Sequence, residues 1–249
     1  MCTKVKQTTP AKEIQAKYKA SLPPEEAAKE DTPNYNANGY DHPQLVVLQN
    51  ENGRVIKKMQ WGLMPNWKRP LEEMLTLAKG NLNARAETIF DKPSFKESIL
   101  KYRCIIPVEG FFEYQDRGKA GKQPFFIFPK GMGNFNFCGI YSYYHTTEVK
   151  EPIRSFAIVT TDANEMMAEI HNSKLRMPLI IADDQIDAWL DPNATREEIE
   201  KLMVPYPSEL MKGYEVSQEL GKMGNVSKAI EEVRKNPDLF GEQGTMDFI

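Results

Sequence analysis

The sequence predicts a mixed α+β fold in a single domain, built on a mainly antiparallel, barrel-like sheet with helices as covers. Short runs of β-branched and aromatic residues recur between Pro, Gly and Asn residues, as is typical of half-buried strands. Segments with helical spacing lie between and after these runs, without the regular alternation of a parallel α/β fold. No internal repeat and no linker rich in Gly, Ser or Pro divides the 249 residues.

The strands are predicted from the apolar runs, which suit a pleated and half-buried surface. They span residues 44–49, 55–63, 104–114, 124–129, 136–144, 155–161 and 177–182. The helices are predicted from apolar residues three or four apart and from start signals such as Asp162, taken as an N-cap. They span residues 11–20, 163–171, 184–190, 195–203 and 225–235, and the polar stretch 21–44 is interpreted as a surface loop.

Composition excludes several classes of protein. The net charge of −3 argues against a protein that coats nucleic acid by bulk electrostatics, so any contact with nucleic acid must use a local basic strip. No apolar run approaches the length of a membrane span, and the polar start lacks the core of a signal peptide, which favours a cytoplasmic protein. Three widely spaced cysteines and three histidines predict no disulfide framework, no metal site and no cofactor.

The second residue, Cys2, is the most informative position in the chain. If Met1 is removed, Cys2 carries both a free α-amine and a thiol. The α-amine titrates near neutrality and the thiolate is a strong nucleophile, so the pair can capture an aldehyde. The amine then forms a Schiff base and the sulfur closes a thiazolidine ring. The same pair can instead attack a peptide carbonyl, and a cysteine at this position can also be incidental.

Two polar patterns interrupt the apolar runs. Glu113 lies among aromatic residues, where a partly desolvated carboxylate can transfer protons near neutral pH; the alternative is a carboxylate on the solvent face of a strand. Alternation places Asn83, Arg85 and Glu87 on one face of an extended segment. This row can position an anionic or sugar-like ligand, or it can form a hydrogen-bonded structural ladder.

A lone histidine and an aromatic turn complete the candidate residues. His171 ends a predicted helix and is a credible acid or base, although a capping or packing role is the common alternative. Trp61 and Trp67 flank a turn that continues into Lys68 and Arg69. Exposed aromatic residues beside basic ones stack unpaired bases and hold phosphates, whereas buried core tryptophans are the alternative, favoured for Trp61.

Taken in order, these motifs resemble the SRAP (SOS response-associated peptidase) family. The resemblance rests on Cys2, the turn of residues 61–67, Asn83 to Glu87, Pro107 to Glu113, and His171 with Arg176-Met-Pro, and it covers about residues 1–220. It implies one SRAP domain across residues 1–249, with a C-terminal extension from about residue 221. It also implies binding to abasic sites in single-stranded DNA and their covalent capture by the N-terminal cysteine. A monomer is expected, associated with the nucleoid when bound to DNA.

The resemblance also implies roles for individual residues. Cys2 is the covalent nucleophile, Asn83 orients the sugar or the α-amine, Glu113 assists proton transfer, and His171 handles protons on the sugar side. The residues expected to contact DNA are Lys4, Trp67, Lys68, Arg69, Arg85 and Arg176. Trp67 is expected to stack or wedge where the strand turns, and the basic residues to hold phosphates.

The chain departs from the family pattern at three places. Thr3-Lys4 replaces a Gly-Arg pair, so that an ammonium replaces a bidentate guanidinium. His171 precedes Arg176 by five positions instead of two, and Asn38-Gly39-Tyr40 replaces an Ala-Pro-type turn. Two other functions stay open at this stage: a cysteine peptidase acting on other proteins, and a single-strand binding module whose Cys2 takes no part.

Overall fold

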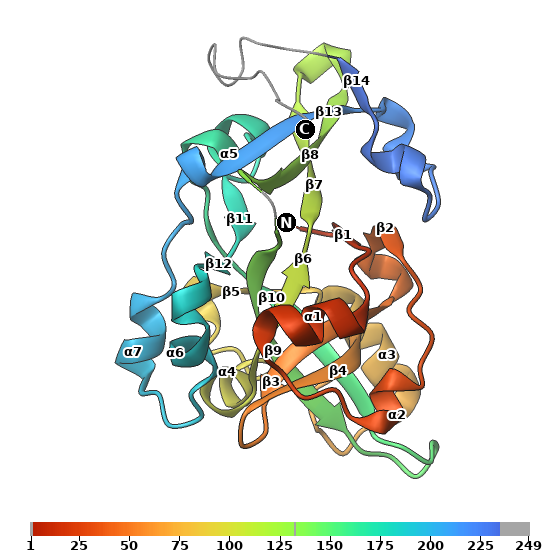
Figure 1. Ribbon diagram of the computed structural model, residues 1–249, viewed down its shortest axis with the longest axis vertical. Helices are drawn as coiled ribbons and strands as arrows, with labels where there is room; N and C mark the ends of the chain where they lie inside the picture. Colours follow the sequence, from red (N-terminus) through yellow and green to blue (C-terminus); the bar gives the residue numbers. More distant parts are fainter. Residues whose placement is uncertain (1, 132, 235–249) are drawn as a thin grey trace.

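A computed structural model describes residues 2–131 and 133–234, and its strands form two sheets (Figure 1). The first sheet has six strands in the order β14-β13-β8-β7-β1-β2, all paired antiparallel. Its strands are β1 (Lys4–Gln7), β2 (Asn34–Asn38), β7 (Gly110–Asp116), β8 (Lys122–Pro129), β13 (Met211–Val216) and β14 (Glu232–Arg234). The first strand of the chain therefore lies inside this sheet and is held on both edges.

The second sheet closes into a five-stranded barrel. Strands β10, β4, β3, β6 and β9 follow one another, and β9 pairs again with β10. All these pairs are antiparallel except the β10–β4 pair. The barrel strands are β3 (Gln44–Asn50), β4 (Arg54–Trp61), β6 (Arg103–Val108), β9 (Phe135–Tyr144) and β10 (Ile153–Asp162). Shorter strands extend it: β5 (Asn83–Arg85), β11 (Arg176–Pro178) and β12 (Ile180–Ile181).

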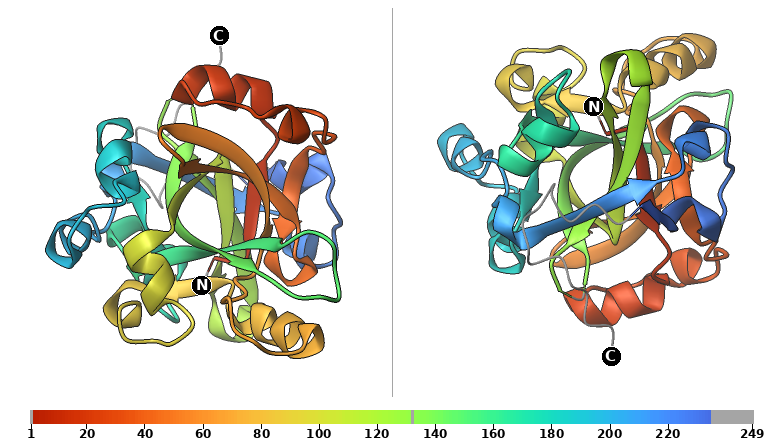
Figure 2. Two further views of the ribbon diagram at one scale, coloured as in Figure 1. Left: turned by 90° about the horizontal axis from the view of Figure 1, so that it is seen from below. Right: turned by 90° about the horizontal axis from the view of Figure 1, so that it is seen from above.

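Short helices surround the barrel rather than crossing over between parallel strands (Figures 1 and 2). They are α1 (Ala11–Tyr18), α2 (Pro24–Ala27), α3 (Leu71–Gly80), α4 (Lys96–Lys101), α5 (Glu165–Ile170), α6 (Ile186–Leu190) and α7 (Arg196–Lys201). Turns of 3-10 helix are η1 (Gly39–Asp41), η2 (Ala86–Thr88), η3 (Gly118–Ala120), η4 (Asp183–Gln185), η5 (Ser208–Leu210), η6 (Gln218–Gly221) and η7 (Ser227–Ile230). The predicted α+β class is confirmed.

The apolar run of β3 shows why the barrel strands lack polar alternation. Leu45 and Val47 belong to one buried cluster, whereas Val46 and Leu48 belong to another. Both faces of the strand are therefore covered, and both must be apolar. The first of these clusters also contains Cys2, which fixes the start of the chain against the core.

All seven predicted strand regions contain strands, but two of them are broken. The predicted run 104–114 divides into β6 and β7 at Glu109, whose carboxylate accepts hydrogen bonds from Thr8 and Thr9 and pairs with Lys6 at 2.7 Å. The predicted run 177–182 divides at Leu179. The run 104–114 thus passes from the second sheet to the first at Glu109-Gly110, where a glutamate and a glycine interrupt the apolar residues.

Four helix predictions are confirmed in place, although the N-cap prediction is wrong. The cap of α5 is Asn164, whose side chain accepts a hydrogen bond from the Met167 amide at 2.8 Å, and not Asp162, which ends β10. The helix predicted at 225–235 is also wrong over its described part. That part contains η7 and β14, because pairing with β13 outweighs the helical spacing of its apolar residues.

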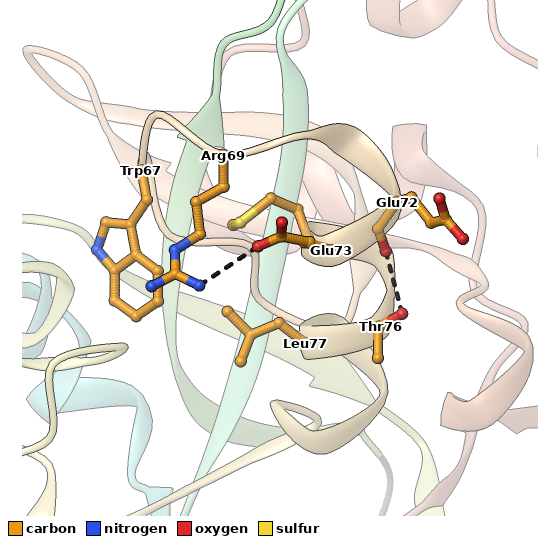
Figure 3. A pocket seen from close by; sticks show the side chains of 7 residues that line it. Trp67, Arg69, Glu72, Glu73, Thr76 and Leu77 are labelled. Atoms are coloured by element: carbon orange, nitrogen blue, oxygen red, sulfur yellow. Dashed lines mark hydrogen bonds and ion pairs between the residues drawn. The ribbon is translucent and has the colours of Figure 1, made fainter.

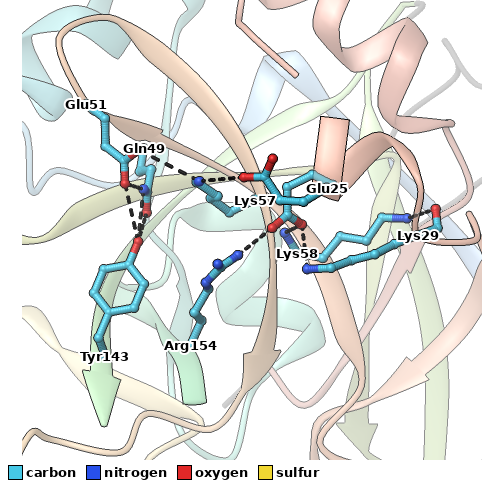
Figure 4. A network of polar contacts seen from close by, with 9 residues as sticks. Glu25, Lys29, Gln49, Glu51, Lys57, Lys58, Tyr143 and Arg154 are labelled. Atoms are coloured by element: carbon cyan, nitrogen blue, oxygen red, sulfur yellow. Dashed lines mark hydrogen bonds and ion pairs between the residues drawn. The ribbon is translucent and has the colours of Figure 1, made fainter. Parts of the chain in front are cut away.

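The loop predicted at 21–44 is wrong as well, since it contains α2, β2 and η1. Proline at the first helical positions begins α2, and pairing with β1 makes a strand of the polar β2. Strands β1, β5 and β13 and helices α3 and α4 were not among the strands and helices predicted from the sequence. The side chain of Glu26 is fully buried, and it fixes α2 to the barrel by binding Arg154 and the Lys58 amide. It also pairs with Lys29, and Figure 4 shows Lys29, Lys58 and Arg154 in this network.

Candidate active site around Cys2

Cys2 lies two residues before β1, in a buried cluster that contains residues of both sheets, such as Phe111 of β7 and Phe156 of β10. The residue is only 1% exposed, and its Sγ lies 3.8 Å from the Lys4 carbonyl oxygen. Burial and, to a smaller extent, the nearby Glu113 carboxylate raise the pKa of the Cys2 thiol well above its usual value. The thiol is therefore protonated in this arrangement, and it needs a proton acceptor before it can act as a nucleophile.

Asn83 reaches Cys2 from the second sheet. It begins β5, which runs parallel to the central strand β10 with Asn83 opposite Ile158. The Asn83 Nδ2 donates a hydrogen bond to the Cys2 carbonyl at 2.8 Å. Its Oδ1 is buried and has no hydrogen-bond partner among the described residues. The side chain that binds the Cys2 carbonyl thus also carries a buried acceptor, which can bind an N–H or O–H group.

Glu113 and His171 form a second buried pair of polar side chains. Glu113 lies on β7 and His171 follows α5, and the His171 Nε2 is 3.7 Å from the Glu113 Oε2. The His171 Nδ1 is 2.8 Å from the Arg176 carbonyl. A carbonyl only accepts, so Nδ1 carries a proton, and Nε2 is the ring nitrogen nearest to Glu113.

The charge state of His171 follows from its surroundings. Burial lowers the pKa of His171, although the Glu113 carboxylate opposes this effect. His171 is therefore mainly neutral at pH 7, and Nε2 can accept a proton. Together with a carboxylate, it provides two groups that exchange protons beside a thiol.

Arg176 is bound within the protein in this structure. Its guanidinium pairs with Glu87, lies 3.1 Å from Asp162 and donates to the Thr160 carbonyl at 2.7 Å. These contacts hold β11 against β10 and the segment after β5, while the Arg176 carbonyl orients His171. The predicted phosphate contact of Arg176 stays a prediction, and it would require exchange of these carboxylates.

The predicted DNA-contacting residues around Trp67 lie beside α3. Trp67 is half-buried, and the Arg69 guanidinium lies over its ring at 5.4 Å from the centroid. Arg69 also lies 3.4 Å from Glu73, and these side chains line a groove of about 410 Å³ along α3 (Figure 3). Lys68 is exposed beside them. Trp61 is fully buried in the core, as the alternative interpretation expected.

Two further predicted cations differ in their surroundings. The Lys4 Nζ donates to the Asn36 Oδ1 at 3.3 Å, and partial burial lowers its pKa although Asp41 opposes this. Arg85 is exposed at the end of β5, and it makes no ion pair within 2–131 and 133–234. Arg85 is therefore open to an external anion, whereas Lys4 already has a protein partner.

Comparison with known proteins places the chain in a family. The family model described as SOS response associated peptidase (SRAP) matches residues 1–223. The chain belongs to the SRAP family. Its SRAP domain is 34% identical over 186 residues to the abasic site processing protein YoqW of Bacillus subtilis, a match that covers 74% of this chain and 79% of that protein. The abasic site processing protein HMCES of Gallus gallus is 34% identical over 158 residues, or 55% of this chain and 46% of that protein.

Solved structures share the fold of this SRAP domain. A protein from Bacteroides thetaiotaomicron has a TM-score of 0.87 and 31% identity, covering 94% of this chain and all (100%) of that one. A protein from Bordetella bronchiseptica has a TM-score of 0.71 at 20% identity, covering 87% of this chain and 100% of that one. The second likeness concerns the fold alone.

The structure shows two further residues at this site that the sequence did not indicate. Thr160 and Asp162 hold the side chain of Arg176, and no local pattern marks them because they come from the end of β10. Within the described part of the chain, no group of three His, Cys, Asp or Glu residues could hold a metal ion. No helix in that same part is long and apolar enough to cross a membrane.

Proposed function

We propose that this protein is an abasic-site sensor that binds single-stranded DNA and links covalently to the lesion through Cys2. The observation that carries the proposal is the arrangement around Cys2: Asn83 binds its carbonyl at 2.8 Å, and Glu113, whose carboxylate helps to raise the pKa of the Cys2 thiol, lies 3.7 Å from His171. The names of the related proteins, which process abasic sites, support it.

The chemistry begins with removal of Met1 by hydrolysis, which consumes one water and frees the α-amine of Cys2. The amine adds to the aldehyde carbon of the ring-opened deoxyribose, and the carbinolamine loses water to give an imine. The Cys2 thiol then adds across the C=N bond, forming a C–S bond while its proton passes to the nitrogen. The product is a thiazolidine, formed with net loss of one water.

The site residues have distinct tasks in these steps. Neutral His171 accepts and returns protons at the sugar through Nε2, and Glu113 transfers the protons of the amine and thiol. Asn83 fixes Cys2 through its carbonyl and offers Oδ1 to the amine or to a sugar hydroxyl. Lowering the barrier to thiol deprotonation is essential because burial makes the resting thiol a weak acid.

Intact-mass measurement tests the proposal. The protein is incubated with an oligonucleotide that carries one abasic site, and with the same oligonucleotide carrying the intact base. The expected product is a heat-stable adduct of Met1-free protein plus DNA minus water, formed only with the abasic strand. Cys2→Ser keeps the amine, so its adduct is expected to survive heating only after borohydride reduction. A processed wild-type protein that forms no adduct would overturn the proposal.

Retention of a heat-stable adduct by Cys2→Ala would also overturn the thiazolidine step. Turnover of an unrelated peptide that depends on Cys2 would instead favour a peptidase acting on other proteins. Tight, reversible binding with equal affinity for the abasic and the intact strand would favour a non-covalent single-strand binding module.

A further inference from the structure

The turn between His171 and Arg176 contains a leucine in an unfavourable backbone conformation. Leu175 has a φ of 52°, in the left-handed region that glycine and asparagine adopt more readily. Within the described part of the chain, the other non-glycine residues with positive φ are Lys19, His42 and Asn52. Leu175 is the aliphatic member of this set. Its side chain makes the left-handed conformation unfavourable, and it has no polar group that could form a compensating local hydrogen bond.

Packing against the core does not explain why position 175 is a leucine. Its side chain is among the exposed large hydrophobic ones, with 52% of the residue accessible, and it belongs to none of the buried clusters. The fold thus gains little from an apolar side chain here, while the backbone conformation opposes it. Residues held in a strained backbone conformation cluster at active sites and at positions that bind ligands.

The turn is fixed in place from several sides. The Leu175 amide donates to the His171 carbonyl at 2.9 Å, and the Leu175 carbonyl accepts from the Ala163 amide at 3.0 Å. Asn172 binds both backbone groups of Asp116, at the end of β7, with distances of 3.0 and 2.9 Å. Leu175 is therefore presented rigidly from an element that also carries His171 of the candidate site.

We propose that Leu175 is a DNA-contacting residue that packs on the unstacked face of the base next to the abasic site. The proposal rests on the proposed function. A missing base leaves its neighbour's aromatic face open to water, and an apolar side chain without hydrogen-bonding groups can cover that face whatever the base is. The adjacent Lys174 is exposed and adds a positive charge at the same turn.

Substitution of Leu175 separates this role from a structural one. Leu175→Gly relieves the left-handed strain, so the Tm is expected to stay unchanged or to rise by about 1–3 °C. Affinity for a single strand carrying a tetrahydrofuran analogue of the abasic site is expected to fall about five- to ten-fold, the size expected for one half-exposed leucine. Leu175→Met keeps an apolar side chain and is expected to retain most of the affinity.

Two matched controls complete the test. Lys19→Gly changes another exposed residue of positive φ, and Leu100→Ala removes another exposed leucine, with 44% accessibility, from α4. Both are expected to bind the analogue as the wild type does. Because the analogue has no aldehyde, this binding does not depend on the thiazolidine chemistry. Wild-type affinity in Leu175→Gly would overturn the inference, whereas wild-type binding without adduct formation on a true abasic strand would overturn only the covalent step.

Discussion

At the scale of single residues, the site depends on polar atoms whose partners come from distant parts of the chain. Asn83 illustrates this, because its amide joins β5 to Cys2 across 81 positions of sequence. The residue type and its alternation with Arg85 were visible in the sequence. The partner was not, because only the parallel pairing of β5 with β10 places Asn83 beside the chain start.

Asn83→Ala is expected to slow adduct formation by about ten- to a hundred-fold. The substitution leaves the Cys2 carbonyl without its donor and removes the Oδ1 acceptor, each of which is worth about 1–3 kcal/mol when buried. Single-turnover formation of the adduct measures the effect. Asn83→Asp, which keeps an acceptor but loses the donor, separates the two contributions. A wild-type rate in both variants would contradict the role of Asn83.

His171 is expected to make stability depend on pH. Its pKa is lowered in the folded state, so the unfolded chain binds more protons as the pH falls through the ordinary histidine value near 6.5. The free energy of unfolding should therefore decrease below about pH 6.5. Urea unfolding at pH 7.5 and 5.5 should show a smaller decrease for His171→Gln than for the wild type. Equal decreases would contradict the lowered pKa.

At the scale of elements, sequence periodicity predicted most strands and helices but not their ends. Runs such as 136–144 are apolar enough to define a strand wherever they lie. The polar β2 is a strand because it pairs with β1. Helix α2 is held in place by the ion pair between Glu26 and Arg154. Elements of this second kind follow from tertiary pairing, which a local pattern does not contain.

Glu26→Gln is expected to destabilise the protein by about 1–3 kcal/mol, because Arg154 and Lys29, which are only partly exposed, lose their buried carboxylate partner. Burial raises the pKa of Glu26, but bonds from Lys29, the Lys58 amide and Arg154 outweigh this and lower it. This stabilisation is present above about pH 4.5 and is lost as the pH falls further.

Urea unfolding at pH 7 measures the effect of Glu26→Gln. Glu25→Gln is the matched control, since its side chain is 58% exposed and lies 3.7 Å from Lys57 (Figure 4). Its change in unfolding free energy is expected to stay within about 0.5 kcal/mol. Equal losses in the two variants would show that the buried network adds nothing beyond a surface pair.

At the scale of the whole molecule, the two sheets bring together residues from the start, the first third, the middle and the last third of the chain. The family resemblance predicted that Cys2, Asn83, Glu113 and His171 act together. The structure gives the geometry: Asn83 contacts Cys2, Glu113 contacts His171, and the longer turn before Arg176 still leaves His171 in the site. The position of His171 could not be predicted from its spacing to Arg176, because a longer turn can accommodate the added residues while its two ends stay in place.

The predicted cations also divide into two classes at this scale. Arg69 lies beside Glu73, and Arg176 beside Glu87 and Asp162. Lys68 and Arg85 are exposed and form no ion pair with any residue of the described ranges. In a protein of net charge −3, the proposed binding to DNA is expected to depend on such unpaired cations.

Lys68→Gln and Arg85→Gln are therefore each expected to reduce the salt dependence of binding. Affinity for the tetrahydrofuran strand is measured between about 50 and 300 mM salt, and each neutralised phosphate contributes about 0.7 to the slope of log affinity against log salt. Arg69→Gln is the matched comparison and should change the slope less, because Glu73 already balances Arg69. Slopes equal to that of the wild type in both Lys68→Gln and Arg85→Gln would place the phosphate contacts elsewhere on the surface.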